Sequence, residues 1–211
     1  MIKEFLLGRK PSHFQVNPIV RAFIISETFI WACWSAIISI FPIFVANEIT
    51  GGSTEIAAFS FSSYLAVRVV FELISGKYLI RSSDLKKFIV SIVGIVFVSI
   101  GYLGFAFTHN IFQIFIFYIF IGIGLGISTP AKNSLFSCHL DKNKESTEWS
   151  IYDAIALFAM AVSAIIGGFI ATKYGFRFLF LMISIINSFG IIPYILFIRK
   201  KKSFLSSLFS G

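Results

Sequence analysis

Six long apolar stretches, separated by polar segments, constrain this chain more than any other feature of its sequence. They run over residues 19–46, 54–79, 88–107, 111–130, 150–172 and 178–198. A helix needs about 20 mainly apolar residues to cross the roughly 30 Å hydrocarbon core of a bilayer, and each stretch reaches that length. Segments such as 112–121 are apolar on every side, whereas the strands of a membrane β-barrel alternate apolar and polar residues. The pattern therefore predicts an all-α integral membrane protein with six transmembrane helices.

Composition supports the same fold class. The chain has 211 residues, of which 57% are hydrophobic and only 13% are charged. A soluble domain carries roughly 25% charged residues, so this chain could not cover a water-facing surface of its own. Only one connecting segment, 131–149, is long, and no extramembrane domain fits between the spans. We therefore expect an N-terminal tail over 1–18, a six-helix bundle over 19–198 and a basic C-terminal tail over 199–211.

Lysine and arginine residues gather on one side of the predicted bundle. They lie in the segments 1–21, 77–87, 131–149 and 199–202. The other side holds Lys173 and Arg177. Because basic loops stay in the cytoplasm, we expect both termini, the loop over 80–87 and the loop over 131–149, which contains Lys132, to be cytoplasmic. The net charge of +8 does not indicate a nucleic-acid partner, since the run 199–202 directly follows a span and is interpreted as an anchor at the lipid surface of the bilayer.

Three segments combine glycines with charged or small residues in a recurring order. The first holds a basic turn, the second a row of glycines before Pro130, and the third a pair of glycines near a span end. Their residues are Gly76, Arg81, Asp84, Lys86 and Lys87, then Gly122, Gly124 and Gly126, then Gly167 and Gly168. In order and spacing these segments resemble the loop 2–3 motif, the glycine-rich fourth helix and the span 5–6 junction of the major facilitator superfamily. The chain departs from that pattern at Ile80, where the family has an acid.

This resemblance implies one bundle equivalent to half of such a transporter, built as a 3+3 inverted repeat. It implies a secondary transporter that moves a small solute or ion by alternating access across a prokaryotic plasma (inner) membrane. Because full-length members have two bundles, it also implies a homodimer or a second six-span subunit. The alternative is a non-transporting six-helix membrane module that binds or scaffolds a partner protein. The sequence identifies neither the substrate nor the coupling ion.

A polar stripe runs along the second span, where buried charges are costly and often functional. Tyr64, Arg68 and Glu72 recur at four-residue spacing, so they share one face of the helix. An ion pair between Arg68 and Glu72 could serve folding by neutralising both charges. Alternatively, Arg68 could contact a substrate or coupling ion.

Glu27 is the acid of the first span, and Trp31 and Trp34 lie on nearly the same face. Glu27 could pair with a basic residue on another helix, or it could stay hydrated near the membrane interface. Tryptophan beside a carboxylate also suits a cation or an aromatic substrate. Asp153 is a further candidate for the pathway, although Ser150 and Asp153 together are typical of a capping box that opens the fifth span.

The remaining signals concern packing and the absence of catalytic motifs. Glycines three or four residues apart let membrane helices approach closely, which is the packing role expected for the glycines of the fourth and fifth spans. Pro42, Pro130 and Pro193 are expected to kink their helices. The sequence has no His-Glu-x-x-His, Gly-x-Ser-x-Gly, Walker-type or Cys-x-x-Cys motif, so we expect no enzyme activity, metal site or cofactor.

Overall fold

The computed structural model describes residues 17–199, so the two predicted tails fall almost wholly outside the described residues. The helices are α2 (Pro18–Ile38), α3 (Phe41–Glu48), α4 (Thr54–Tyr78), α5 (Asp84–Ala106), α6 (Ile111–Cys138), α7 (Glu145–Tyr174) and α8 (Phe176–Phe189). After a break, the last helix resumes over 192–199. Within this part of the chain, six helical spans are long and apolar enough to cross a membrane, which confirms the predicted fold class.

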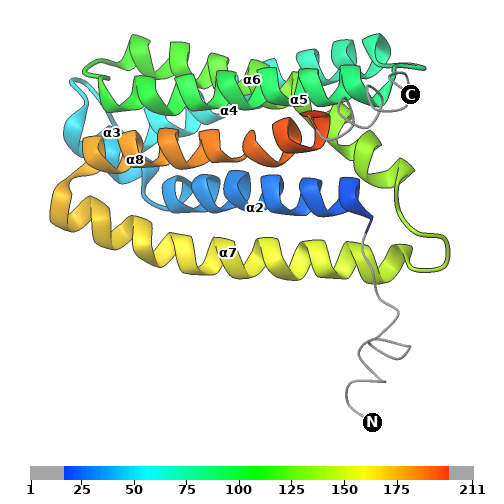
Figure 1. Cartoon of the computed structure of the whole chain (residues 1–211). Helices are drawn as coiled ribbons and strands as arrows, with labels where there is room; N and C mark the ends of the chain where they lie inside the picture. Colours follow the sequence, from blue (N-terminus) through cyan, green and yellow to red (C-terminus); the bar gives the residue numbers. More distant parts are fainter. Residues whose placement is uncertain (1–16, 200–211) are drawn as a thin grey trace.

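The helices pack so that the two halves of the chain interlock. Helices α4 and α5 lie along α6, α2 lies along α7, and α8 packs against α5 (Figure 1). In this view α7 forms one outer edge, and α5 and α6 form the opposite edge. The first three spans (α2 with α3, α4 and α5) therefore make more contacts with the last three spans (α6, α7 and α8) than among themselves. This is expected for two repeats that share one core.

The first predicted span is not one continuous helix. Helix α2 ends at Ile38, and the short α3 begins at Phe41 with Pro42 in its first turn. A proline inside a helix lacks the N–H group that would bond the carbonyl four residues earlier, and its ring clashes with that carbonyl. At the start of a helix neither penalty arises, so Pro42 ends α2 and opens α3.

The fourth span begins at Ile111 as predicted but ends later, and the fifth span begins earlier than predicted. Helix α6 continues through Pro130 to Cys138, because Ala131, Leu135 and Phe136 keep an apolar face that is buried in the bundle. Helix α7 begins at Glu145, five residues before the predicted start at 150. The predicted capping box is therefore wrong.

The hydrogen bonds at the start of α7 explain this correction. The Ser150 hydroxyl donates to the carbonyl of Ser146 at 2.8 Å and lies inside the helix. The first turn is joined to the preceding loop by Glu148, whose Oε2 accepts from the Asp141 N–H at 2.9 Å. Since Asp153 lies two turns inside α7, it has no capping role.

The last span is interrupted at Gly190 and Ile191, three residues before Pro193. The Tyr194 N–H bonds to the carbonyl of Ile191 rather than to that of Gly190. The Gly190 carbonyl accepts instead from the Ser26 hydroxyl of α2 at 2.7 Å. The expected irregularity near Pro193 is therefore present, and a side chain of another helix satisfies the released carbonyl.

Two glycines of α6 set the distance between α6 and α4. A Cβ atom on Gly122 would lie 2.8 Å from the carbonyl oxygen of Tyr64, and one on Gly126 would lie 2.8 Å from that of Arg68. Both contacts are shorter than a real side chain allows. These glycines therefore let the α4 backbone approach α6 at Tyr64 and Arg68, two of the three residues of the polar stripe.

The other predicted packing glycines, and Gly76 of the loop 2–3 motif, differ in how closely a neighbouring helix approaches them. A Cβ atom on Gly124 would lie 2.6 Å from the carbonyl oxygen of Gly94 on α5, and one on Gly167 would lie 2.5 Å from a carbonyl of α2. In contrast, a Cβ atom on Gly168 or Gly76 would meet nothing within 4 Å. The structure thus places Gly124 and Gly167 at close helix contacts and leaves Gly168 and Gly76 in open space.

Candidate functional site

A cavity of about 460 Å³ lies between α2, α4, α6 and α7. This volume falls within the roughly 300–1,000 Å³ typical of small-molecule sites. Its walls are rich in aromatic side chains, namely Trp31, Trp34, Phe61, Tyr64, Tyr102, Trp149 and Tyr152. Its polar lining comes from Glu27, Arg68, Thr129, Lys132 and Asn133. The site is therefore an aromatic chamber with a few charged groups.

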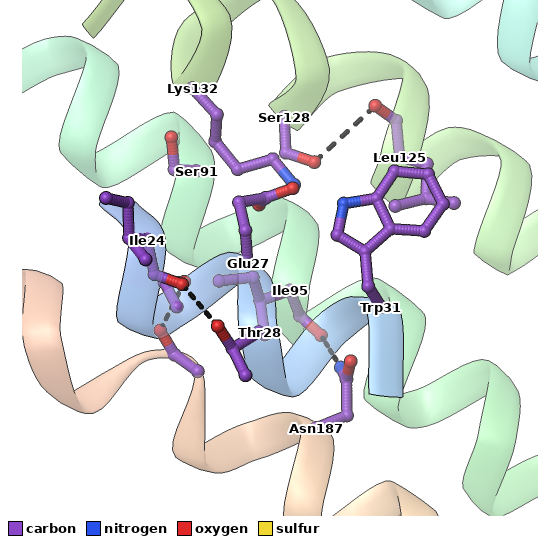
Figure 2. A network of polar contacts seen from close by, with 12 residues as sticks. Ile24, Glu27, Thr28, Trp31, Ser91, Ile95, Leu125, Ser128, Lys132 and Asn187 are labelled. Atoms are coloured by element: carbon purple, nitrogen blue, oxygen red, sulfur yellow. Dashed lines mark hydrogen bonds and ion pairs between the residues drawn. The ribbon is translucent and has the colours of Figure 1, made fainter. Parts of the chain in front are cut away.

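A buried ion pair crosses from α6 to α2 at this cavity. The Nζ atom of Lys132 lies 2.6 Å from Oε1 of Glu27, and the two side chains are 4% and 7% exposed. Figure 2 shows the Lys132 side chain extending from α6 toward Glu27. Of the two possibilities left open for Glu27, pairing with a basic residue on another helix is the one observed.

Lys132 itself requires a correction. The sequence placed it in a basic loop, whereas it lies inside α6 and is only 3% exposed. The reason is the continuation of α6 beyond Pro130, which turns Lys132 toward the core. Thr129, Lys132 and Asn133 lie three and four residues apart, and this spacing would have indicated a common helix face if α6 had been predicted to continue.

The polar stripe of α4 forms a local network. Arg68 Nε lies 3.3 Å from Oε2 of Glu72, so the predicted ion pair is present. Arg68 Nη1 donates to the Tyr64 hydroxyl at 3.0 Å. Arg68 and Tyr64 line the cavity, whereas Glu72 pairs with Arg68 without lining it. Arg68 is thus both paired with an acid and placed at the cavity wall.

The two tryptophans of α2 contact two walls of the cavity, one formed by α4 and one by α7. Trp31 Nε1 donates to the Tyr152 hydroxyl on α7 at 2.9 Å. The Trp34 ring centre lies 5.4 Å from that of Tyr64 and 6.1 Å from that of Phe61, both on α4. Aromatic pairs at such distances stabilise their mutual arrangement. Helix α2 therefore holds the α4 and α7 walls through its indole rings.

The structure brings together five of the seven predicted pathway residues at this cavity. These are Glu27, Trp31, Trp34, Tyr64 and Arg68. Asp153 is exposed on α7 and does not line the cavity, so it is not part of the site. The function of the five residues stays a prediction.

Aromatic side chains close the opposite end of the bundle. Phe41, Phe44, Phe105, Tyr118 and Phe180 come from α3, α5, α6 and α8, and each is at most 2% exposed. The ring centres that are in contact within this cluster lie 4.8–6.4 Å apart. The cavity therefore lies toward the α6–α7 loop, and the bundle is sealed beyond it.

The residues of the loop 2–3 motif tie helix ends together and do not line the cavity. Oδ2 of Asp84 lies 3.3 Å from Nε2 of His139, which joins the start of α5 to the end of α6. Lys86 Nζ lies 3.6 Å from the centre of the Tyr78 ring at the end of α4. Lys87 is buried in the first turn of α5. Arg81 has a φ of 55°, a left-handed conformation that reverses the chain between the helices.

The geometry suits reversible binding. Across residues 17–199, no group of three or more His, Cys, Asp or Glu side chains is arranged to hold a metal ion. The charged groups at the cavity are held by ion pairs, and the aromatic rings provide flat apolar surfaces. Such a site has the size and lining to bind a small solute.

Comparison with models of known families shows which family the chain belongs to. The model of the Major Facilitator Superfamily matches residues 23–208. The chain belongs to this superfamily. Its membership and its six apolar spans make it a multi-pass membrane protein, and the predicted resemblance is confirmed. The superfamily points to transport rather than catalysis.

Curated relatives in the superfamily are considerably longer. The chain is 25% identical over 137 residues to the "Proton-coupled antiporter flippase LtaA" of Staphylococcus haemolyticus (strain JCSC1435), which covers 65% of this chain and 34% of that relative. A protein of the same name from Staphylococcus epidermidis (strain RP62A) is 25% identical over 93 residues, or 43% of this chain and 23% of the relative. The aligned part thus spans about a third or less of these relatives.

Proposed function

We propose that this chain is one bundle of a secondary transporter that moves a small solute across the membrane by alternating access. The observation that carries this proposal is the cavity where Glu27, Lys132 and Arg68 meet aromatic side chains of four helices. Charged residues inside membrane spans are costly, and they commonly mark solute or ion pathways. A module that only scaffolds a partner needs no such chamber, so the cavity favours transport.

A second six-helix bundle would complete the transporter. Only 17% of the apolar segment of α4 and 11% of that of α7 are buried within the bundle, against 56% for α5. Both helices line the cavity, so a second bundle packed against them would add a further wall to it. Transporters of this superfamily pair two bundles about an axis along the membrane normal. We propose a second copy of this chain in the same orientation, or another six-span subunit, as that partner.

The names of the curated relatives suggest a coupling ion. They are called proton-coupled antiporters, and Glu27 is the acid at the cavity of this chain. Protonation of Glu27 would remove its charge and release Lys132 from the ion pair. We therefore extend the proposal to proton-coupled exchange, with Glu27 as the group that takes the proton.

Flux in proteoliposomes tests the proposal. Purified protein is reconstituted, and uptake of labelled sugars, amines and organic acids is measured with and without an imposed pH gradient. We expect saturable uptake of at least one class, faster with the gradient and impaired by Arg68→Ala and by Glu72→Ala. Arg177→Ala is the matched control. Arg177 does not line the cavity, and its Nη2 atom lies 2.9 Å from Nδ1 of His109.

The oligomeric mass in nanodiscs is measured on the same preparation. A mass of two chains supports the homodimer, and co-purification with another six-span subunit supports the heteromeric pair. A folded protein that stays monomeric and moves none of the solutes would overturn the transport proposal.

A further inference from the structure

Arg68 provides the accessible charge of the cavity. Glu27 and Lys132 are in contact with each other and almost fully buried, whereas the Arg68 side chain is 27% exposed. Glu27 is the single acid among the cavity-lining residues of the described chain, and Lys132 already neutralises it. A solute that enters the cavity therefore meets the Arg68 guanidinium, whose acidic partner Glu72 does not line the cavity.

The Arg68 guanidinium also has N–H groups that do not donate to any described residue. Its Nε and Nη1 atoms contact Glu72 and Tyr64, while Nη2 has no hydrogen-bond partner among residues 17–199 and is not among the buried unpaired atoms. Planar oxyanions such as carboxylates accept N–H donors of an arginine in a paired geometry. The Tyr64 and Glu72 contacts fix the orientation of the guanidinium and leave Nη2 for a ligand.

The walls around Arg68 favour a flat apolar body. Trp31 and Trp34 of α2, Tyr64 of α4, and Trp149 and Tyr152 of α7 line the same space. Aromatic rings stack on flat apolar groups and also attract cations. A cation, however, would meet the Arg68 guanidinium inside the cavity, whereas Glu72, the acid that pairs with it, does not line the cavity.

We propose that this cavity binds a small organic anion with an aromatic or flat apolar body. Arg68 Nη2 binds the oxyanion, and the indole and phenol rings of α2, α4 and α7 surround the body. This assignment names the substrate class of the proposed transporter and rests on that proposed function.

Three indoles that share the ring system and differ in the charge of a short side chain test this assignment by equilibrium binding to the full chain in nanodiscs. They are tritiated indole-3-acetate, indole-3-acetamide and tryptamine, which are anionic, neutral and cationic. We expect the acetate to bind about tenfold more tightly than the acetamide, as expected for a hydrogen bond between two charged groups, and tryptamine to bind most weakly.

Variants separate the charge of Arg68 from the shape of the cavity. Arg68→Gln is expected to remove the preference for the acetate while the acetamide affinity changes less than threefold. Arg177→Gln, outside the cavity, is expected to preserve the preference. If Arg68→Gln does not fold, Asn133→Asp gives a second test, because Asn133 is an exposed lining residue and a new acid there should weaken only acetate binding.

The outcomes distinguish this inference from the transport proposal. Equal binding of acetate and acetamide, tighter binding of tryptamine, binding of none of the three, or an unchanged preference in both Arg68→Gln and Asn133→Asp would each overturn the anion site. Saturable uptake of a sugar or an amine together with one of these results would leave transport standing. Preferential acetate binding without flux of any solute would support the site and overturn transport.

Discussion

The Nζ atom of Lys132 lies 2.6 Å from Oε1 of Glu27, and this contact joins α6 to α2 inside the bundle. Removing two charges from water costs several kcal/mol for each ion, and their attraction offsets that cost only in good geometry. Breaking such a pair leaves one buried charge without compensation, whereas removing both charges does not. The contact can therefore be tested by comparing single and double substitutions.

We predict that Glu27→Gln and Lys132→Met each lower the free energy of unfolding by about 3–5 kcal/mol, because each leaves a buried partner unpaired. The double variant Glu27→Gln/Lys132→Met should recover most of this loss. Unfolding in mixed micelles, followed by tryptophan fluorescence, measures these values. Lys144→Met is the control, since its pair with Asp141 is about one third exposed and such pairs contribute about 0–1 kcal/mol. A double variant no more stable than either single one would contradict the prediction.

Close packing between α5 and α6 gives a second prediction. Because a Cβ atom on Gly124 would lie 2.6 Å from the Gly94 carbonyl oxygen, Gly124→Ala must push the helices apart. We expect it to lower the unfolding free energy by about 1–3 kcal/mol, the usual cost of overpacking. Gly168→Ala is the matched control, and it should be neutral or stabilise by up to about 1 kcal/mol through its higher helix propensity. Equal losses at both positions would show that the Gly94–Gly124 contact does not limit the approach of the helices.

Features that depend on local sequence were predictable. The six spans follow from runs of apolar residues, because a chain in lipid must satisfy its backbone polar groups within each helix. The Arg68–Glu72 pair follows from four-residue spacing, which places two side chains together on any helix. Neither inference requires knowledge of how the helices pack.

Features that depend on packing were not predictable in the same way. The partner of Glu27 depends on the rotation of α2 against α6, and no short-range pattern encodes that rotation. The sequence predicts a loop at Lys132, because Pro130 and the polar residues that follow it resemble a helix end. What continues α6 is the burial of Leu135 and Phe136 against other helices, a tertiary effect.

The two cysteines provide a test of orientation. Cys138 is exposed at the end of α6, and Cys33 is buried in α2. If the basic loops are cytoplasmic, a membrane-impermeant maleimide should label Cys138 only after the cells are permeabilised. Cys33 should stay unlabelled until the protein is denatured. Labelling of Cys138 in intact cells would show the opposite orientation.

The break in the last span gives the final prediction. The Ser26 hydroxyl donates to the Gly190 carbonyl at 2.7 Å, and the Ser26 side chain is fully buried. Ser26→Ala leaves this carbonyl without its donor, so we expect a loss of about 1–3 kcal/mol in unfolding free energy.

Ser62→Ala is the control for this prediction. The Ser62 hydroxyl is exposed and bonds only to the carbonyl of Ala58 on its own helix, so its removal should change stability by less than about 0.5 kcal/mol. Both variants are measured by the same unfolding titration. Equal effects would mean that another donor satisfies Gly190, and that α2 does not hold the break in place.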